Sequence, residues 1–284
     1  MKIKCLKIVL IISFIFFSNI IAQQNKISWK KSDEVQKSKL HLFHSTHSIN
    51  LPTTETHQKG DLEFEISHRF IPTVSDGIDA LYGFDGPANI KFSLGYAVTE
   101  NIIATIARTN VDDNLLIKGK YQFFQFDNSS LPFQVAFEGG IAWNSDPIGR
   151  AASDNMNFQY YGQLIFNTLI NKKLGIGLVP SYIYNSHIYC PEKEYSFTFG
   201  TNLQYYISSL VSVLAEWNPT VSGFRNKYNS LSFGVELETG GHFFKIILSN
   251  NATLNPTQFL SGADLPITTK NWRIGFNITR LLNI

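Results

Sequence analysis

The feature that most restricts the fold of this chain is an alternation of apolar and polar side chains with a period of two residues. The segment NWRIGFNITR, residues 271–280, shows it most clearly, because every second residue from Trp272 to Ile278 is apolar and the residues between them are polar or glycine. In an extended strand this period places all the apolar side chains on one face. That face contacts either the core of a soluble protein or lipid.

The same alternation recurs in about twelve segments after Gly60, separated by segments rich in turn-forming residues. The composition agrees, since 23 Phe, 12 Tyr and 4 Trp are combined with only 16% charged residues, a balance that favours strands over helical bundles. One segment, 102–109, is weaker because apolar residues occupy both of its faces. The predicted strands are 62–70, 89–98, 102–109, 114–124, 132–143, 157–166, 174–184, 195–206, 210–218, 230–239, 242–250 and 271–280.

The connections between these strands alternate between short turns and long polar loops. The turns are TEN, NTLINKK, ISS and GG, and the loops between them are long except for the short one at 110–113. An up-and-down barrel that crosses the bacterial outer membrane has this arrangement, with short periplasmic turns and long outer loops, whereas a Greek-key sandwich does not sort its loops in this way. No apolar run in the predicted mature chain reaches the ~18 residues of a spanning helix. The sequence therefore predicts an all-β fold, a single up-and-down antiparallel transmembrane β-barrel of about 12 strands over residues 62–284, with a soluble periplasmic β protein as the alternative.

The first residues have the layout of a secretory signal peptide. Lys2, Lys4 and Lys7 precede an apolar run, and small and apolar residues end at Ala22. Residues 1–22 are therefore predicted to be removed on export to the outer membrane of a Gram-negative-type bacterium, and residues 23–61 form a polar, His-rich segment ahead of the barrel. Without the three lysines the formal net charge changes from +2 to −1, and no basic patch remains for a nucleic-acid partner.

Aromatic residues on the apolar faces cluster near the two ends of the predicted strands. Amphipathic rings are enriched where a membrane protein crosses the two lipid interfaces. The apolar faces are therefore predicted to contact outer-membrane lipid, and two aromatic girdles are expected. The girdle residues are Trp143, Tyr160, Tyr184, Tyr195, Trp217 and Trp272 at the outer end and Tyr96 and Tyr205 at the inner end.

The opposite, polar faces carry charges of both signs. Two interpretations are open: a salt-bridged interior that keeps a narrow barrel closed, or a pore whose charges select a small solute. The predicted lumen-lining residues are Glu63, Glu65, Lys91, Lys118, Lys120, Glu138, Glu216, Glu236, Glu238, Lys245 and Arg273.

Four segments carry a resemblance to a known family: ISHRF (66–70), GFDGPANIKFSLGYAVTENI (83–102), GGHFFKIILSNN (240–251) and GFNITR (275–280). In these the sequence resembles a family of uncharacterised bacterial outer-membrane-type β-barrel proteins, a domain of unknown function, over roughly residues 40–284. The resemblance implies the same barrel and supplies no catalytic residues. The family often has glycine directly after HRF, whereas Ile71 and Pro72 follow here, so the tightness of that turn differs.

The histidines are the remaining candidates for chemistry. Five of the seven, His41, His44, His47, His57 and His68, lie within 28 residues, but they lack the Cys or acidic partners of a strong metal site. A polar extended segment in or below the lumen is the preferred interpretation, and no metal or cofactor is predicted.

His68 has the parity of the lipid-facing side at the outer rim, where a lipid-modifying enzyme would need a serine and an acid beside it. The neighbouring strands are expected to offer Ile90 and Trp272 instead. The chain also has no nucleotide-binding or hydrolase motif. The expected function is therefore a non-enzymatic pore, solute-binding or structural barrel, with an outer-membrane lipid-modifying enzyme as the alternative and the oligomeric state left open.

Overall fold

The computed structural model describes residues 39–268 and 270–283. The predicted signal peptide and residues 23–38 of the predicted pre-barrel segment lie outside the described residues. Residues 40–284 form one compact unit, and the fold below is that of this unit. Within the described part of the chain, no helix is long and apolar enough to cross a membrane.

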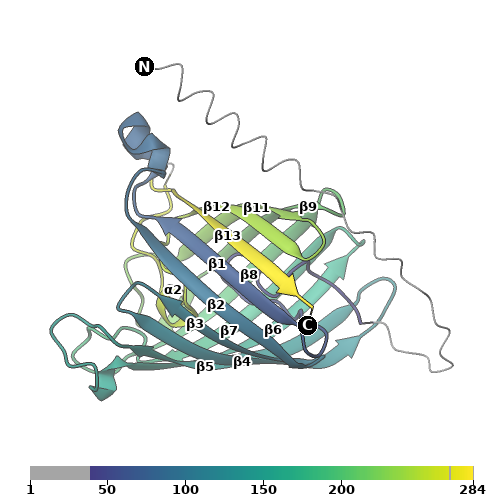
Figure 1. Ribbon diagram of the computed structural model, residues 1–284, viewed down its shortest axis with the longest axis horizontal. Helices are drawn as coiled ribbons and strands as arrows, with labels where there is room; N and C mark the ends of the chain where they lie inside the picture. The colour runs from purple at the N-terminus through teal and green to yellow at the C-terminus, as the bar shows by residue number, and fades with distance from the viewer. Residues whose placement is uncertain (1–38, 269, 284) are drawn as a thin grey trace. The chain divides into compact units, whose positions relative to one another are not determined.

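Thirteen strands run along the part of the chain that the structure describes, and every neighbouring pair is antiparallel (Figure 1). In the same residues three short helices interrupt the connections. The strands are β1 (Leu62–Phe70), β2 (Ala88–Thr99), β3 (Ile102–Thr109), β4 (Asn114–Phe126), β5 (Phe133–Asn144), β6 (Phe158–Ile170), β7 (Leu174–Tyr184), β8 (Tyr195–Tyr206), β9 (Val211–Asn218), β10 (Thr220–Gly223), β11 (Ser230–Glu238), β12 (His242–Ser249) and β13 (Arg273–Leu282); the helices are η1 (Val74–Gly83), η2 (Asn155–Asn157) and α2 (Pro256–Phe259).

The sheet closes on itself into a barrel. Each strand pairs with its neighbour in sequence from β1 to β9, the last strand β13 pairs with β1 from Leu282 opposite Leu62 onward, and β12, β11 and β9 complete the ring. Figure 1 shows β13 in yellow lying beside β1 in purple. The prediction of a closed antiparallel barrel of about 12 strands is confirmed, and the thirteenth strand, β10, is a short addition to the edge of β8.

Most predicted strand ends are off by one or two residues, and two differences change a connection. The loop expected at 219–229 contains β10, which continues along β8 after β9 ends. Pro219 separates β9 from β10 because proline has no N–H to donate to a ladder. The turn expected at 167–173 is shorter, since β6 continues to Ile170 and pairs there with Leu174.

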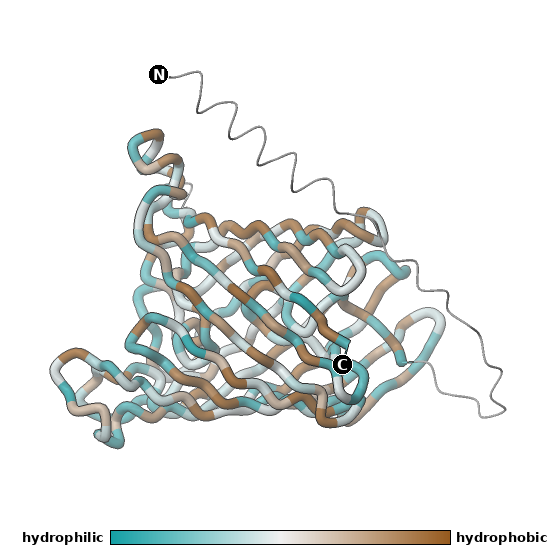
Figure 2. The backbone as a smooth tube through the Cα atoms, in the orientation of Figure 1, coloured by the Kyte–Doolittle hydropathy of each residue, from teal (hydrophilic) through white to brown (hydrophobic). Residues whose placement is uncertain are grey.

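The barrel has an apolar outside and a polar inside. In β3 and β4 exposed and buried residues alternate strictly over most of their length, and the exposed ones are largely apolar. For example, Ile117 on the outer face is 69% exposed, while the adjacent Lys118 on the inner face is 8% exposed. Figure 2 shows the corresponding alternation of brown and teal along the strands. A soluble protein of this size would bury those apolar side chains, so the outer face is suited to lipid.

Candidate functional site

Residues 40–57, called the luminal segment from here on, fold back on themselves inside the barrel. Its centre is a tight reversal in which Ser48 N donates to Leu51 O at 2.9 Å and Thr53 N donates to Thr46 O at 2.9 Å. Nearly all residues from Leu42 to Thr56 are buried although the segment has no regular strand or helix of its own. Its main-chain groups therefore need partners from elsewhere.

Glu216 on β9 supplies partners for the tip of this reversal. One of its carboxylate oxygens accepts hydrogen bonds from the main-chain N–H groups of Ile49, Asn50 and Leu51, at 3.1, 2.9 and 2.8 Å. The other oxygen accepts from the side-chain amide of Asn50 at 3.2 Å. Successive N–H groups that converge on one oxygen form an anion-binding nest, and here the anion is a side chain of the barrel wall.

Two lysines hold the carbonyl side of the luminal segment. Lys245 Nζ on β12 donates to the main-chain oxygens of His47 and Ser48, at 2.5 and 2.6 Å. Lys120 Nζ on β4 donates to the main-chain oxygens of Thr46 and Thr53, both at 3.1 Å, and so ties the two arms of the reversal together. A carboxylate of the wall therefore binds the N–H groups of the segment, and two ammonium groups of the wall bind its carbonyl oxygens.

The histidines of the luminal segment pair with acids one by one. His44 Nδ1 lies 2.9 Å from Glu236 Oε1, and His57 Nε2 lies 2.6 Å from Glu63 Oε2. His41 Nδ1 lies 2.8 Å from Glu55 Oε2. In residues 39–268 and 270–283 no group of three or more His, Cys, Asp or Glu side chains is arranged to hold a metal ion.

His47 has basic surroundings instead. Its Nε2 lies 2.8 Å from Lys118 Nζ and therefore accepts from the ammonium, while its Nδ1 lies 3.0 Å from the hydroxyl of Thr46, which itself donates to Glu63. Burial, and then the charges of Lys118 and Lys120, hold the pKa of His47 well below its ordinary value. This histidine is neutral when the luminal segment is in place.

Most of the predicted lumen-lining charges are buried and paired. Lys91 lies 2.8 Å from Glu65, and Lys118 lies 3.2 Å from Glu138. Lys245 lies 3.2 Å from Glu236, and Arg273 lies 2.7 Å from Asp264. Glu238 differs because it lies at the turn after β11 and not along the inner wall. It accepts hydrogen bonds there from the N–H groups of Gly240 and Gly241.

Arg69 belongs to the same set although sequence reasoning did not select it. Its side chain is fully buried and donates to Asn50 Oδ1 of the luminal segment at 3.0 Å and to Asn277 Oδ1 of β13 at 2.8 Å. Parity could have identified it, because it follows Glu63 and Glu65 on the same face of β1.

The loop between β12 and β13 closes the barrel from the end opposite the turns. Residues 250–263, called the inner loop from here on, are almost all buried, although the sequence predicted a polar external loop at 251–270. Asn255 donates to Asn114 at 2.7 Å and Asn218 donates to the main-chain oxygen of Leu260 at 3.3 Å. Leu260 also belongs, with Leu51 of the luminal segment, to one apolar cluster inside the barrel.

One cavity between these two fillings is small. A cavity of about 10 Å³ is lined by His47 and Asn50 from the luminal segment, Lys91 and Lys118 from the wall, and Leu254 among others from the inner loop. Such a cavity holds about one water molecule. In this conformation the charged wall is occupied by the chain itself.

The predicted girdle residues all have outward parity at strand ends. Six of the eight are exposed, and Trp143 and Trp272 are half-buried. The indole of Trp143 donates to the main-chain oxygen of Ala152 at 2.9 Å, and Tyr160 packs beside Tyr184 with ring centroids 6.4 Å apart. Their assignment to the two membrane interfaces stays a prediction.

His68 faces outward without the partners of a hydrolase. It pairs across the sheet with Ile90 and Phe276, so the expectation that Trp272 is its neighbour on the last strand was wrong by four residues. Its ring stacks on Phe276 with centroids 4.5 Å apart. Neither cross-strand neighbour is a serine or an acid.

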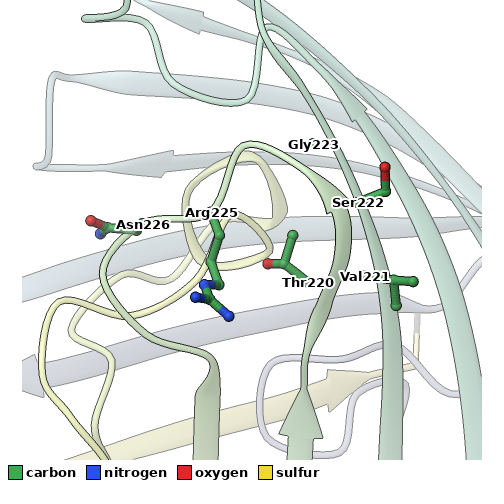
Figure 3. A pocket seen from close by; sticks show the side chains of 6 residues that line it. All are labelled: Thr220, Val221, Ser222, Gly223, Arg225 and Asn226. Atoms are coloured by element: carbon green, nitrogen blue, oxygen red, sulfur yellow. The ribbon is translucent and has the colours of Figure 1, made fainter.

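A further pocket, of about 400 Å³, lies on the outside where β10 ends. Figure 3 shows Thr220 and Arg225 on one side of this turn and Val221 and Ser222 on the other. Gly223 there has a φ of +82° and its Cα faces Tyr195 O so closely that a Cβ would lie 2.1 Å from that oxygen. The pocket contains none of the predicted lumen-lining residues.

Comparison with known proteins places the barrel among membrane proteins. A family model described as "Membrane bound beta barrel domain (DUF5777)" matches residues 43–282. An outer membrane channel from Pseudomonas putida F1 aligns with 81% of this chain and 98% of its own, at 11% identity and a TM-score of 0.49. The NanC porin aligns with 78% of this chain and 99% of its own, at 8% identity and a TM-score of 0.46.

An enzyme is among the structural neighbours as well. Outer membrane phospholipase A from Escherichia coli aligns with 84% of this chain and 95% of its own, at 11% identity and a TM-score of 0.39. Identities this low carry no information about activity. No significant match was found among curated proteins.

Proposed function

The chain belongs to the membrane bound beta barrel domain family (DUF5777), and from this premise we propose that it is a non-enzymatic outer-membrane barrel that its own luminal segment keeps closed and that passes a small solute when this segment moves. The observation that supports the proposal is the way the segment is held. It is bound by hydrogen bonds and ion pairs to side chains of β1, β4, β9, β11 and β12, and its reversal has no ladder to the barrel strands. Such contacts can be exchanged for water without breaking the barrel.

The polar wall behind the segment supports a passage rather than a core. Lys118, Lys120, Glu216 and Glu236 are inward-facing, and a wall that served only to support packing would be expected to be apolar, since replacing buried ion pairs by apolar side chains is often neutral or stabilising. Charged residues facing the lumen are typical of barrels that conduct solutes.

The alternative of a lipid-modifying enzyme has less support. Its one outward candidate, His68, lies between Ile90 and Phe276. A purified sample that releases fatty acid from phospholipid vesicles, with the release abolished by His68→Ala, would favour the enzyme over the pore.

Conductance in a planar bilayer tests the proposal. The mature protein is expected to be nearly silent, and a variant lacking residues 23–57 is expected to conduct ions. The full-length variant Lys245→Met, which loses the hydrogen bonds to His47 and Ser48, is expected to open more often than wild type. Equal conductance in all three would show that the segment does not close the lumen, and silence in all three would favour a structural role.

A further inference from the structure

Three neighbouring strands differ from the rest of the barrel in having no charged residue. β6, β7 and β8 contain no Asp, Glu, Lys or Arg, whereas every other strand of the twelve-strand ring carries at least one. Amides and hydroxyls replace the charges on the inner face. The uncharged wall, as this face is called below, is defined by the buried side chains Gln163, Asn167, Ser181, Thr198 and Asn202.

The cross-strand register arranges these side chains in rows. Asn167, Gly177 and Asn202 lie opposite one another across β6, β7 and β8. Four residues along each strand, Gln163, Ser181 and Thr198 form a second polar row. The level between the two rows holds Ile165, Val179 and Gly200, so polar and apolar levels alternate up the wall.

The polar rows have hydrogen-bonding groups that no partner satisfies among the described residues. They are Asn167 Nδ2, both side-chain polar atoms of Asn202, Gln163 Oε1 and Thr198 Oγ1. Buried polar atoms in proteins are normally paired, so a cluster of unpaired ones on one wall indicates a missing partner.

Two of these amides converge on a single glycine. A Cβ on Gly177 would lie 2.2 Å from Asn202 Oδ1 and 2.6 Å from Asn167 Nδ2, yet the two amides are not hydrogen-bonded to each other. The donor Asn167 Nδ2 and the acceptor Asn202 Oδ1 therefore both lie beside Gly177, the residue of this row that has no side chain.

The luminal segment makes few polar contacts with this wall. Asn167 Oδ1 accepts from Thr54 N at 2.6 Å. At the end of β8, Gln204 Oε1 accepts from His44 N at 3.3 Å and Tyr206 donates to the main-chain oxygen of Leu42 at 2.8 Å. At the level between the rows the contact is apolar, since a Cβ on Gly200 would be 2.7 Å from Leu51 Cδ1. The segment therefore forms ion pairs with the charged strands and only neutral hydrogen bonds and apolar contacts with β6, β7 and β8.

The chemistry of the unpaired atoms restricts the ligand. A hydroxyl group can accept from Asn167 Nδ2 and donate to Asn202 Oδ1 at the same time, whereas a carboxylate cannot donate and an ammonium cannot accept. The apolar level between the rows suits the C–H face of a polyhydroxylated ring. An ion gains nothing from a wall without a counter-charge.

We propose that the uncharged wall is a binding track for a neutral polyhydroxylated solute of the saccharide class, which takes the place of the luminal segment along β6, β7 and β8. The inference rests on the proposed function, since the track becomes accessible only when the segment moves. The main polar contact is a solute hydroxyl that accepts a hydrogen bond from Asn167 and donates one to Asn202.

Uptake by proteoliposomes tests it, with the full mature chain carrying Lys245→Met in every arm so that the segment is loosened equally. The probes are radiolabelled sucrose and, as a charged polyhydroxylated control, gluconate. Saturable sucrose uptake is expected to exceed gluconate uptake. Asn202→Leu replaces the unpaired amide by an apolar group of similar size. It is expected to raise the half-saturation concentration for sucrose about ten-fold, as the loss of one hydrogen bond at Oδ1 and one at Nδ2 would.

Thermal unfolding and two glycine variants distinguish a loss of sucrose binding from a loss of folding. Asn202→Leu is expected not to lower the thermal unfolding midpoint, because it removes atoms that have no partner. Gly177→Ala is expected to impair sucrose uptake by displacing both amides, whereas Gly119→Ala, where a Cβ would meet nothing within 4 Å, is the matched control and is expected to behave as its parent.

Three results would overturn the inference: no sucrose uptake by the parent, equal half-saturation in parent and Asn202→Leu, or gluconate uptake equal to that of sucrose. The first two would mean that the unpaired amides hold only water. If Lys245→Met conducts small ions in the planar bilayer but takes up no sucrose, the proposed function stands and the saccharide track alone is wrong.

Discussion

Glu216 on β9 accepts a hydrogen bond from the main-chain N–H of Leu51 at 2.8 Å, 165 residues earlier in the chain. The same oxygen also accepts from the N–H groups of Ile49 and Asn50. One carboxylate therefore satisfies three consecutive amides at the tip of the luminal segment.

Glu216→Ala should release that tip while the barrel stays folded. Each of the three buried amides left without a partner costs about 1–3 kcal/mol in the closed state. Hydrogen exchange measured by mass spectrometry is expected to accelerate at least ten-fold in peptides covering residues 40–57 and to stay unchanged in β6 and β7. Unchanged exchange at residues 49–51 would show that Glu216 does not hold the segment.

Arg69→Met should lower the stability of the barrel itself. The change leaves Asn50 Oδ1 and Asn277 Oδ1 without their donor and removes one positive charge from the neighbourhood of Glu216 and Glu65. A loss of about 3–5 kcal/mol is expected from breaking a fully buried charge arrangement. The measurement is the urea midpoint of folding in lipid vesicles.

Arg108→Met provides the control for Arg69→Met. Arg108 is half exposed and pairs with Asp113 at the loop end of the barrel. An exposed ion pair of this kind contributes about 1 kcal/mol or less. If the two variants lose equal stability, burial of Arg69 is not the cause.

Mild acid should loosen the luminal segment through His47. Its pKa is depressed in the closed state, so the open state binds the proton more readily, and the closed state loses stability as the pH falls below the ordinary value of ~6.5. The groups facing it are Lys118, Lys120, Lys91 and Lys245, with Glu65 Oε2 at 3.9 Å. Open probability in planar bilayers is therefore expected to rise between pH 7 and pH 5.

His47→Gln isolates that contribution. The glutamine retains an oxygen that can accept from Lys118 but does not titrate. The variant is expected to show a smaller rise in open probability on acidification than the wild type. Identical pH profiles would assign the effect to other groups.

Ile246→Lys should prevent insertion of the barrel into a bilayer. Ile246 is 67% exposed in the middle of β12, and a lysine on the lipid face near the bilayer midplane costs about 2–4 kcal/mol. Folding yield in vesicles, read from the shift in gel mobility on heating, is expected to fall. Ile148→Lys, at an 84% exposed position in the loop after β5, is the control and should fold normally.

The barrel could be predicted from the sequence because its two signals are local. A two-residue period reports the faces of each strand, and loop length reports which end a connection occupies. The same parity placed Lys118, Lys120 and Glu216 inside, and it would have placed Arg69 there as well. Pro219 correctly indicated the end of the strand before it, but nothing in the sequence indicated that pairing resumes at Thr220.

The partners of the inward charges could not be predicted. Glu216, Lys120 and Lys245 bind main-chain groups of the luminal segment. Because nearly every residue has the same main-chain groups, the sequence does not show which of them will be bound. The inner loop was missed for a related reason. Asn251 and Asn255 look like residues of an external loop, although Phe259 and Leu260 nearby were a signal of burial that polar neighbours obscured.

The luminal segment contacts strands that come early in the sequence, β1 and β4, and strands that come late, β11 and β12. The joining of β1 to β13 brings together residues as far apart as Leu62 and Leu282, and contacts of such long range are the slowest to form during folding. If early and late strands first bind the luminal segment, they are already close together when β1 pairs with β13. Less conformational entropy is then lost when the barrel closes. The segment that fills the barrel can thus also serve as the template on which the barrel assembles.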